Sequence, residues 1–202
     1  MVSEKWDRLG PTLEGQLVRV EPLAEAHEAE LREAAGDPDI WRWLPLNAGS
    51  SAELFHRWLL DALEREAAGQ EAPFVIVDRA TGVAIGSTRF LALRPEHRGL
   101  EIGWTWLAPS KWRSGVNVET KLLLLGYAFE QLECIRVEFK TDALNERSRA
   151  ALAGIGAEFE GILRSHMIVR GDVIRDSAYY SVIAREWPNV RARLQGRLQA
   201  HS

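Results

Sequence analysis

Hydrophobic residues recur every three or four positions between residues 116 and 132. The spacings are 4, 3, 4 and 3, along Val118, Leu122, Leu125, Phe129 and Leu132. Because such a repeat keeps apolar side chains on one face of a helix, it predicts an amphipathic α-helix. Shorter apolar runs, bounded by Gly, Pro or Asp, lie before and after this segment and are typical of strands. The pattern therefore predicts a fold that combines helices and strands.

The predicted elements follow one another in the order β-α-α-β-β-β-α-β-α-β-β, with a further helix at the end. Strands are expected in 16–23, 72–93 (two strands), 99–108, 134–142 and 158–183 (two strands), and helices in 24–35, 51–69, 116–132, 145–156 and 186–199. Consecutive strands without a helix between them favour antiparallel pairing, whereas the helical crossover between 99–108 and 134–142 is the only place where a parallel pair is expected. The fold class predicted is α+β (α/β mixed), with a mixed, mostly antiparallel sheet of about seven strands flanked by helices.

Composition narrows the class of protein. The chain has 202 residues, 46% hydrophobic and 27% charged, which fits one globular domain over residues 1–202. A formal net charge of −4 argues against a nucleic-acid partner, since such proteins usually present a basic face. No apolar run approaches the ~20 residues of a membrane span and no signal segment is apparent, so we expect no membrane partner and a cytoplasmic location.

Metal-binding and disulfide chemistry have little support in the sequence. Cys134 is the only cysteine, and it lies among apolar residues that indicate a buried position. The five His residues are scattered, without the Cys/His spacing of a zinc site. We therefore expect no metal.

The segment APSKWRSG, residues 108–115, joins an apolar strand directly to the amphipathic helix. The first turn of a helix has N–H groups without partners and carries the positive end of the helix dipole. Beside the basic residues Lys111 and Arg113, this helix start suits an anion such as a pyrophosphate. The alternative is a loop in which Gly115 only turns the chain. The segment matches neither G-x-G-x-x-G nor G-x-x-x-x-G-K-[ST], which disfavours a dinucleotide or triphosphate fold.

The whole chain, from LEGQLVRVEPLAEAH through NERSRAALAGIGA to RDSAYYSVIAREWP, resembles the GNAT N-acetyltransferases, in particular the ribosomal-protein N-terminal acetyltransferases. The resemblance implies acetyl-CoA as co-substrate and a [Q/R]-x-x-G-x-[G/A] loop for its pyrophosphate. The corresponding residues are Trp112, Arg113, Ser114, Gly115, Val116 and Asn117. Only the Gly is kept, and Arg113 replaces a common second Gly. Backbone amides are the main ligands in such loops, so binding can survive this departure, and Arg113 either contacts a phosphate or crowds the coenzyme.

Glu101, on the strand before the loop, is the first candidate for a general base that accepts the proton of an acceptor amine. The alternatives are an exposed strand carboxylate or a structural salt bridge. Asp142, at the end of the neighbouring strand, is expected near the rim of the acceptor site. For the acyl carbonyl, the resemblance implies a main-chain N–H near the end of strand 99–108, around Trp106, Leu107 and Ala108 and before Pro109, which has no N–H.

The motif NERS, residues 145–148, has a structural and a functional interpretation. Asn145 is a good helix N-cap, and Ser148 lies at the third helical position. The resemblance implies that Asn145 contacts the pantetheine arm and that Ser148 can protonate the leaving thiolate. The general acid usual in the family is a Tyr, and none occurs between Tyr127 and Tyr179. Ser148 is therefore the candidate acid.

The acceptor is expected to be a primary amine, either a protein N-terminus or a small molecule, attacking acyl-CoA directly in a ternary complex. Trp41 and Trp43, expected in a loop between the first two helices, are candidates for lining its pocket, with core packing as the alternative. A homodimer is plausible by resemblance only. The degenerate loop and missing Tyr leave a second hypothesis, a non-catalytic acyl-CoA-binding module.

Overall fold

The computed structural model describes residues 4–6 and 9–200, and its centre is a single eight-stranded sheet with the order β1-β2-β3-β4-β5-β6-β8-β7. The strands are β1 (Leu13–Glu14), β2 (Val18–Pro22), β3 (Ala72–Asp78), β4 (Ala84–Arg94), β5 (Gly99–Leu107), β6 (Arg136–Asp142), β7 (Glu158–Val169) and β8 (Val173–Ile183). The sheet has one strand more than predicted, because the two residues of β1 pair with β2, and two residues give no periodicity to detect. All neighbours are antiparallel except β5 and β6, so the predicted parallel pair is confirmed.

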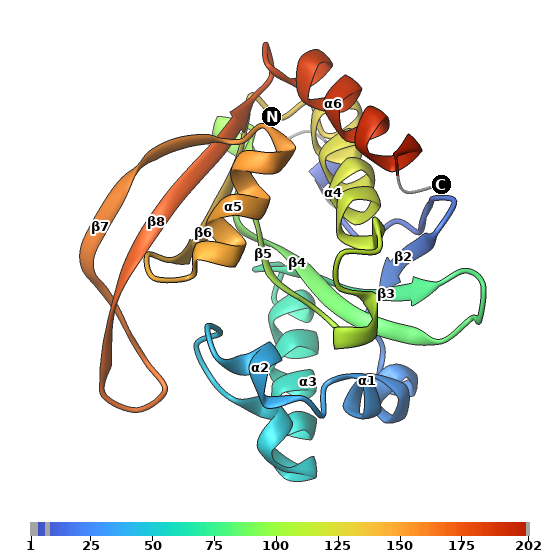
Figure 1. The fold of residues 1–202 in the computed structure, drawn as a ribbon, viewed down its shortest axis with the longest axis vertical. Helices are drawn as coiled ribbons and strands as arrows, with labels where there is room; N and C mark the ends of the chain where they lie inside the picture. The colour runs from blue at the N-terminus through green and yellow to red at the C-terminus, as the bar shows by residue number, and fades with distance from the viewer. Residues whose placement is uncertain (1–3, 7–8, 201–202) are drawn as a thin grey trace.

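The helices lie on both faces of this sheet (Figure 1). They are α1 (Glu28–Ala34), α2 (Pro38–Trp41), α3 (Ala52–Ala67), α4 (Val116–Gly126), α5 (Glu146–Ile155) and α6 (Trp187–Gln199). Short 3-10 turns are η1 (Glu4–Trp6), η2 (Glu25–His27), η3 (Ala48–Ser50), η4 (Pro95–His97) and η5 (Pro109–Lys111), and α4 continues into a π-helical turn, η6 (Tyr127–Gln131). Trp41 therefore ends a helix, whereas a loop was predicted for it. None of the helices in the described part of the chain is long and apolar enough to cross a membrane.

Two apolar cores form on the two faces of the sheet, because side chains of a strand point alternately to either side. On β3, Phe74 and Ile76 pack into the core under α4, α5 and α6, whereas Val75 and Val77 pack into the core under α1–α3. All of β3 is buried, as expected for a strand covered on both faces. The β7–β8 hairpin extends as a long curved arm beyond this layered centre (Figure 1).

An opening in the sheet follows from the short pairing between β5 and β6. These strands pair only at Gly99–Arg136, Leu100–Val137 and Glu101–Glu138, although β5 continues to Leu107 and β6 to Asp142. The register between β4 and β5 shifts beside Trp104, which has a φ of 52°, so β5 carries a bulge there. Beyond Glu101 the edge of β5 that faces β6 has no partner strand.

Helix α4 is fixed to the N-terminal part of the sheet by a buried carboxylate. Glu119 is 4% exposed, and its two oxygens accept the N–H groups of Gln16, Leu17 and Val18 at 2.7, 2.7 and 2.8 Å. One side chain thus satisfies three backbone donors, and the N–H of the fully buried Val18 would otherwise have no acceptor here. Glu119 therefore sets the position of α4, and with it the helix start that faces the opening.

We expect Glu119→Ala to lower the free energy of unfolding by about 3–5 kcal/mol, because three N–H groups would lose a charged acceptor. Urea denaturation monitored by circular dichroism measures this change. The matched control is Glu64→Ala on α3, an exposed helical carboxylate whose removal should alter stability by less than ~0.5 kcal/mol. Equal effects of the two substitutions would contradict the anchoring role of Glu119.

Candidate active site

The loop between β5 and α4 is held by its own side chains and presents its backbone. Gly115 has a φ of 82° and forms the N-cap of α4 without a side-chain hydrogen bond, so the N–H groups that follow it are not capped by its side chain. The Ser114 hydroxyl donates to the Lys111 carbonyl at 2.6 Å, and the Lys111 amine pairs with Asp78. This pairing holds the pKa of Asp78 below its usual value, so Lys111 is already engaged by a carboxylate.

Two residues of the predicted pyrophosphate motif have unequal surroundings. Trp112 donates its indole N–H to the Leu107 carbonyl at 2.9 Å, and the Arg147 guanidinium lies 4.2 Å from its ring centroid. Arg113 is exposed, and its φ of 62° is unusual for a residue with a side chain. The indole therefore ties the loop to the end of β5, whereas the Arg113 side chain remains at the surface beside the helix start.

The end of β5 directs one backbone donor toward the opening. Ala108 donates its N–H to the Ile85 carbonyl at 2.8 Å, toward the β4 side. Successive N–H groups of a strand point to opposite edges, so the N–H of Leu107 points toward the side of β6. Among the residues around Trp106 proposed for the acyl carbonyl, Leu107 thus has the orientation that the role requires. The Trp106 side chain is 4% exposed and belongs to the core under α1–α3.

Glu101 is buried on the face of the sheet opposite α4. Its neighbours Leu100 and Ile102 point into the core under α4–α6, so the Glu101 side chain points to the other face. The residue is 4% exposed, and its carboxylate lies 3.3 Å from the Lys140 amine. Burial raises the pKa of Glu101, and Lys140 only partly opposes this shift. Of the two structural alternatives, the exposed carboxylate does not fit and the salt bridge is present, and the role of Glu101 as a base stays a prediction.

Around Glu101 lies a polar surface that local sequence patterns do not reveal. Arg175 on β8 is 5% exposed, its Nε has no hydrogen-bond partner among the described residues, and burial lowers its pKa while Asp142 and Glu101 oppose the shift. His166 on β7 lies 3.0 Å from the Ser177 hydroxyl, and burial lowers its pKa. Strand alternation and the position of β8 next to β6 bring these groups to one face. Local sequence patterns do not show this, because it depends on pairing between distant segments.

The side chains proposed for the acceptor pocket differ in burial. Trp41 is 1% exposed, packs edge-on against Phe55 and Trp58, and donates its indole N–H to the Ala35 carbonyl at 2.9 Å. These contacts match the core-packing alternative. Trp43 is half-buried in the segment after α2. Asp142 ends β6 and accepts the Leu144 N–H at 2.9 Å, a contact that shapes the turn.

The NERS motif forms the start of α5. The Asn145 carboxamide oxygen accepts the Ser148 N–H at 3.0 Å, which confirms the predicted N-cap. Asn145 is 9% exposed, and Ser148 is half-buried. The cap uses the amide oxygen, so the NH₂ group of Asn145 is left to bind elsewhere, and its contact with pantetheine stays a prediction.

Lys121 is a residue of this region that the sequence prediction missed. It lies on α4, is 5% exposed, and donates to the Thr105 hydroxyl at 2.7 Å. Its position, three residues after Val118 and four before Leu125, places it on the inner face of an amphipathic helix, and that spacing could have revealed it. Burial lowers the pKa of Lys121 to about 7.

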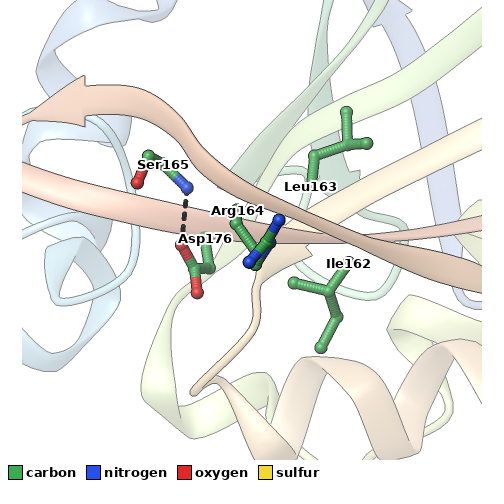
Figure 2. Close-up of a pocket in the computed structure, with 5 residues that line it drawn as sticks. All are labelled: Ile162, Leu163, Arg164, Ser165 and Asp176. Atoms are coloured by element: carbon green, nitrogen blue, oxygen red, sulfur yellow. Dashed lines mark hydrogen bonds between the residues drawn. The ribbon is translucent and has the colours of Figure 1, made fainter.

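A hollow on the β7–β8 arm is lined by none of the predicted site residues. Figure 2 shows its lining: Ile162, Leu163, Arg164, Ser165 and Asp176. The Ser165 N–H donates to the Asp176 carboxylate at 2.7 Å, so the carboxylate in this hollow already has a hydrogen-bond partner. Residues 4–6 and 9–200 contain no group of three His, Cys, Asp or Glu side chains arranged to hold a metal ion.

Comparison with known proteins identifies the family to which this arrangement belongs. Residues 18–158 match the acetyltransferase (GNAT) domain model. The chain belongs to the GNAT acetyltransferase family. The crystal structure of a GCN5-related N-acetyltransferase from Brucella melitensis is similar to it, with 31% identity, a TM-score of 0.86, and coverage of 93% of this chain and 85% of that one.

Two curated GNAT relatives come from Bacillus subtilis (strain 168). The N-acetyltransferase YoaA is 33% identical over 108 residues, and YdaF, provisionally named a ribosomal N-acetyltransferase, is 38% identical over 91 residues. The matches cover 54% and 45% of this chain, and 60% and 49% of the respective relatives. The chain thus matches only about half of these two relatives, but nearly all of the solved GNAT structure.

The stability of the protein should depend on pH through Lys121. An unfolded Lys titrates near 10.5 and the folded one at about 7, so between these values the unfolded state binds more protons and stability rises with pH. Relative to Lys121→Met, the wild-type free energy of unfolding should rise by up to ~1.4 kcal/mol per pH unit above pH ~7 and stay level below it. Urea denaturation of both proteins at pH 6–9 measures the difference. A difference independent of pH would show that Lys121 titrates normally.

Proposed function

We propose that this chain transfers the acetyl group of acetyl-CoA to a primary amine by direct attack in a ternary complex. The observation that carries the proposal is the opening between β5 and β6, which has the α4 start and loop at one side and buried Glu101 at the other. A GNAT chain with this arrangement has separate approaches for a coenzyme and for an amine.

The residues around the opening fit acetyl-CoA. Backbone donors of the first turn of α4 after Gly115 suit the pyrophosphate, and the Asn145 amide suits an amide of the pantetheine arm. Leu107 supplies an N–H for the acyl carbonyl oxygen. Acetyl-CoA itself supplies an activated thioester. The side chain of Arg113 lies at the surface of this loop, and we propose that it contributes charge to phosphate binding.

Glu101 is proposed to remove the proton of the acceptor ammonium, directly or through water. A carboxylate whose pKa is raised by burial is a better proton acceptor than an exposed one. The Lys140 amine, 3.3 Å from the Glu101 carboxylate, favours the ionised form of Glu101 and partly opposes the rise of its pKa. Trp43 and the polar face around Arg175 are proposed to border the amine. A protein N-terminus and a small amine both fit these requirements. The cytoplasmic location and a homodimer stay predictions.

A thiol-release assay with acetyl-CoA over a panel of amines and N-terminal peptides tests the function. We expect turnover with at least one class of acceptor, together with stabilisation of the protein against heat by millimolar acetyl-CoA. Stabilisation without any turnover would favour a non-catalytic acyl-CoA-binding module. Neither stabilisation nor turnover would refute the proposal as a whole.

Glu101→Gln should lower kcat by roughly 10²–10⁴-fold, the usual contribution of a general base, and change the affinity for coenzyme A little. The Gln side chain keeps the shape of Glu101 and removes its ability to accept a proton. Steady-state kinetics with a working acceptor, together with calorimetric binding of coenzyme A, measure both effects. The matched control is Glu30→Gln on α1, a carboxylate on the same side of the sheet that accepts the Ala84 N–H. A rate for Glu101→Gln within a few-fold of the control would leave Glu101 with a structural role.

Arg113→Ala should weaken coenzyme A binding by about two- to fivefold at low salt, because one exposed charge near a phosphate contributes up to ~1 kcal/mol and is screened by ions. Arg113→Gly should weaken binding similarly and stabilise the free protein, since Gly adopts a positive φ without strain. Calorimetry at 20 and 500 mM NaCl and thermal denaturation separate the two effects. Tighter binding by either variant would show that the Arg113 side chain crowds the coenzyme.

A further inference from the structure

Lys121 places a buried amine at the opening of the sheet, on the coenzyme side. Its Nζ donates to Thr105 on β5 and lies 5.7 Å from the ring centroid of Phe139 on β6. These contacts reach both strands beyond the point where their pairing ends at Glu101 and Glu138. The amine therefore borders the opening from the face that α4 covers, the same face on which the α4 start lies.

The surroundings of Lys121 supply hydrogen bonds but no counter-charge. The Thr105 hydroxyl lies 2.8 Å from that of Thr88, and among the described residues no carboxylate lies within ion-pair distance of the Lys121 amine. A buried amine without a counter-ion destabilises a fold when it is charged. An apolar side chain would fill the same inner position of α4 without that cost, so packing alone gives no reason for a lysine.

Side chains with an exchangeable proton on this face differ in what they contact. Tyr180 on β8 points into the core under α4–α6. Its hydroxyl is bound to α5, where it accepts a hydrogen bond from the Arg149 Nε at 3.2 Å. Ser148, on the half-buried surface of α5, is a weak acid with an alcohol pKa far above that of a thiol. Lys121 is the group that combines an exchangeable proton with contacts on both strands of the opening.

We propose that Lys121 is the acid that protonates the departing thiolate of coenzyme A during acetyl transfer. The inference rests on the proposed function. As the amine nitrogen bonds to the acetyl carbon, the carbon–sulfur bond breaks and its electron pair goes to sulfur. Lys121 gives one proton from its ammonium to that sulfur and becomes neutral. The acceptor ammonium loses two protons, one through Glu101 before attack and one as the carbon–nitrogen bond forms, and both pass to solvent. One proton from solvent then returns to Lys121, so each turnover releases one proton and atoms and charge balance.

The acidity of the Lys121 ammonium agrees with its proposed role as proton donor. Burial lowers the pKa of Lys121 to about 7, and burial is the only cause of the shift. The charged side chains on the elements packed around it do not contribute: Arg89 on β4, Glu101 on β5, Glu138, Lys140 and Asp142 on β6, and Glu119 on α4. An ammonium that titrates near neutrality can protonate a thiolate whose thiol has a pKa near 8.5.

The kinetic test compares Lys121→Met with Leu124→Met, a buried control on the same helix, and with Ser148→Ala. The kcat of each protein is measured by thiol release from pH 6 to pH 10, beside calorimetric affinity for coenzyme A. For Lys121→Met we expect kcat to fall about 100-fold, affinity to stay within about threefold, and the wild-type decline of kcat above pH ~7 to disappear. Leu124→Met and Ser148→Ala should both keep the decline of kcat above pH ~7.

Three kinetic results would overturn the proposal. One is an unchanged pH profile in Lys121→Met, and another is a loss confined to coenzyme affinity. The third is disappearance of the decline in Ser148→Ala, which would make Ser148 the acid. Detection by mass spectrometry of an acetyl group on Lys121 that an added amine removes would also overturn it, because Lys121 would then be a nucleophile.

A second readout does not depend on turnover. In protein carrying ¹⁵N-labelled lysine, the Nζ signal missing from Lys121→Met identifies Lys121, and it should titrate near pH 7. Coenzyme A should shift this signal and its titration midpoint, whereas desulfo-coenzyme A, which lacks the sulfur, should bind and leave the midpoint in place. Equal effects of the two ligands would refute contact with the sulfur. If the wild type has no turnover, the proposed function fails, and this comparison alone decides the place of Lys121.

Discussion

The early end of pairing between β5 and β6 is the constraint on which the rest of the site depends. A parallel pair that stopped inside a core would leave buried N–H and C=O groups without partners, which is unfavourable unless something else binds them. Here the bulge at Trp104 turns β5 away just after Glu101, and α4 begins soon after β5 ends. The sheet thus stays continuous at one end of both strands and open at the other, and the open end is where a ligand can complete the hydrogen bonding.

This opening also separates two electrostatic environments. Glu101, Lys140 and Arg175 lie on the face of the sheet opposite α4, where two cations balance the carboxylates around them. Lys121 lies on the α4 face, where its amine contacts the Thr105 hydroxyl and the ring of Phe139. A carboxylate with a raised pKa and an amine with a lowered pKa, the proposed proton acceptor and donor, are therefore kept apart by the sheet. Their separation prevents them from pairing with each other, which would remove both functions.

Much of the fold follows from local patterns, because periodicity reports which positions are covered. The helical spacing from Val118 to Leu132 and the order of elements predicted α4, the mixed sheet and its single parallel pair. The pattern could not place β8 between β6 and β7, since that depends on register between distant segments. For the same reason it did not show that Glu101 is buried beside Lys140, or that Arg175 shares its face. The motifs at Gly115 and Asn145 were visible, because turns and caps are encoded locally.

The departure of the loop from the family motif is explained by what its side chains do. Trp112 occupies the position where Gln or Arg is usual. Its indole N–H donates to the carbonyl of Leu107, the residue whose own N–H points into the opening. Lys111 and Ser114 are likewise held by Asp78 and by the loop backbone. With these side chains committed to the protein, the groups left to meet an anion are the amides after Gly115 and the exposed Arg113. These side-chain contacts hold the loop backbone in position. The identity of most loop side chains can therefore vary while the backbone N–H donors after Gly115 stay in place.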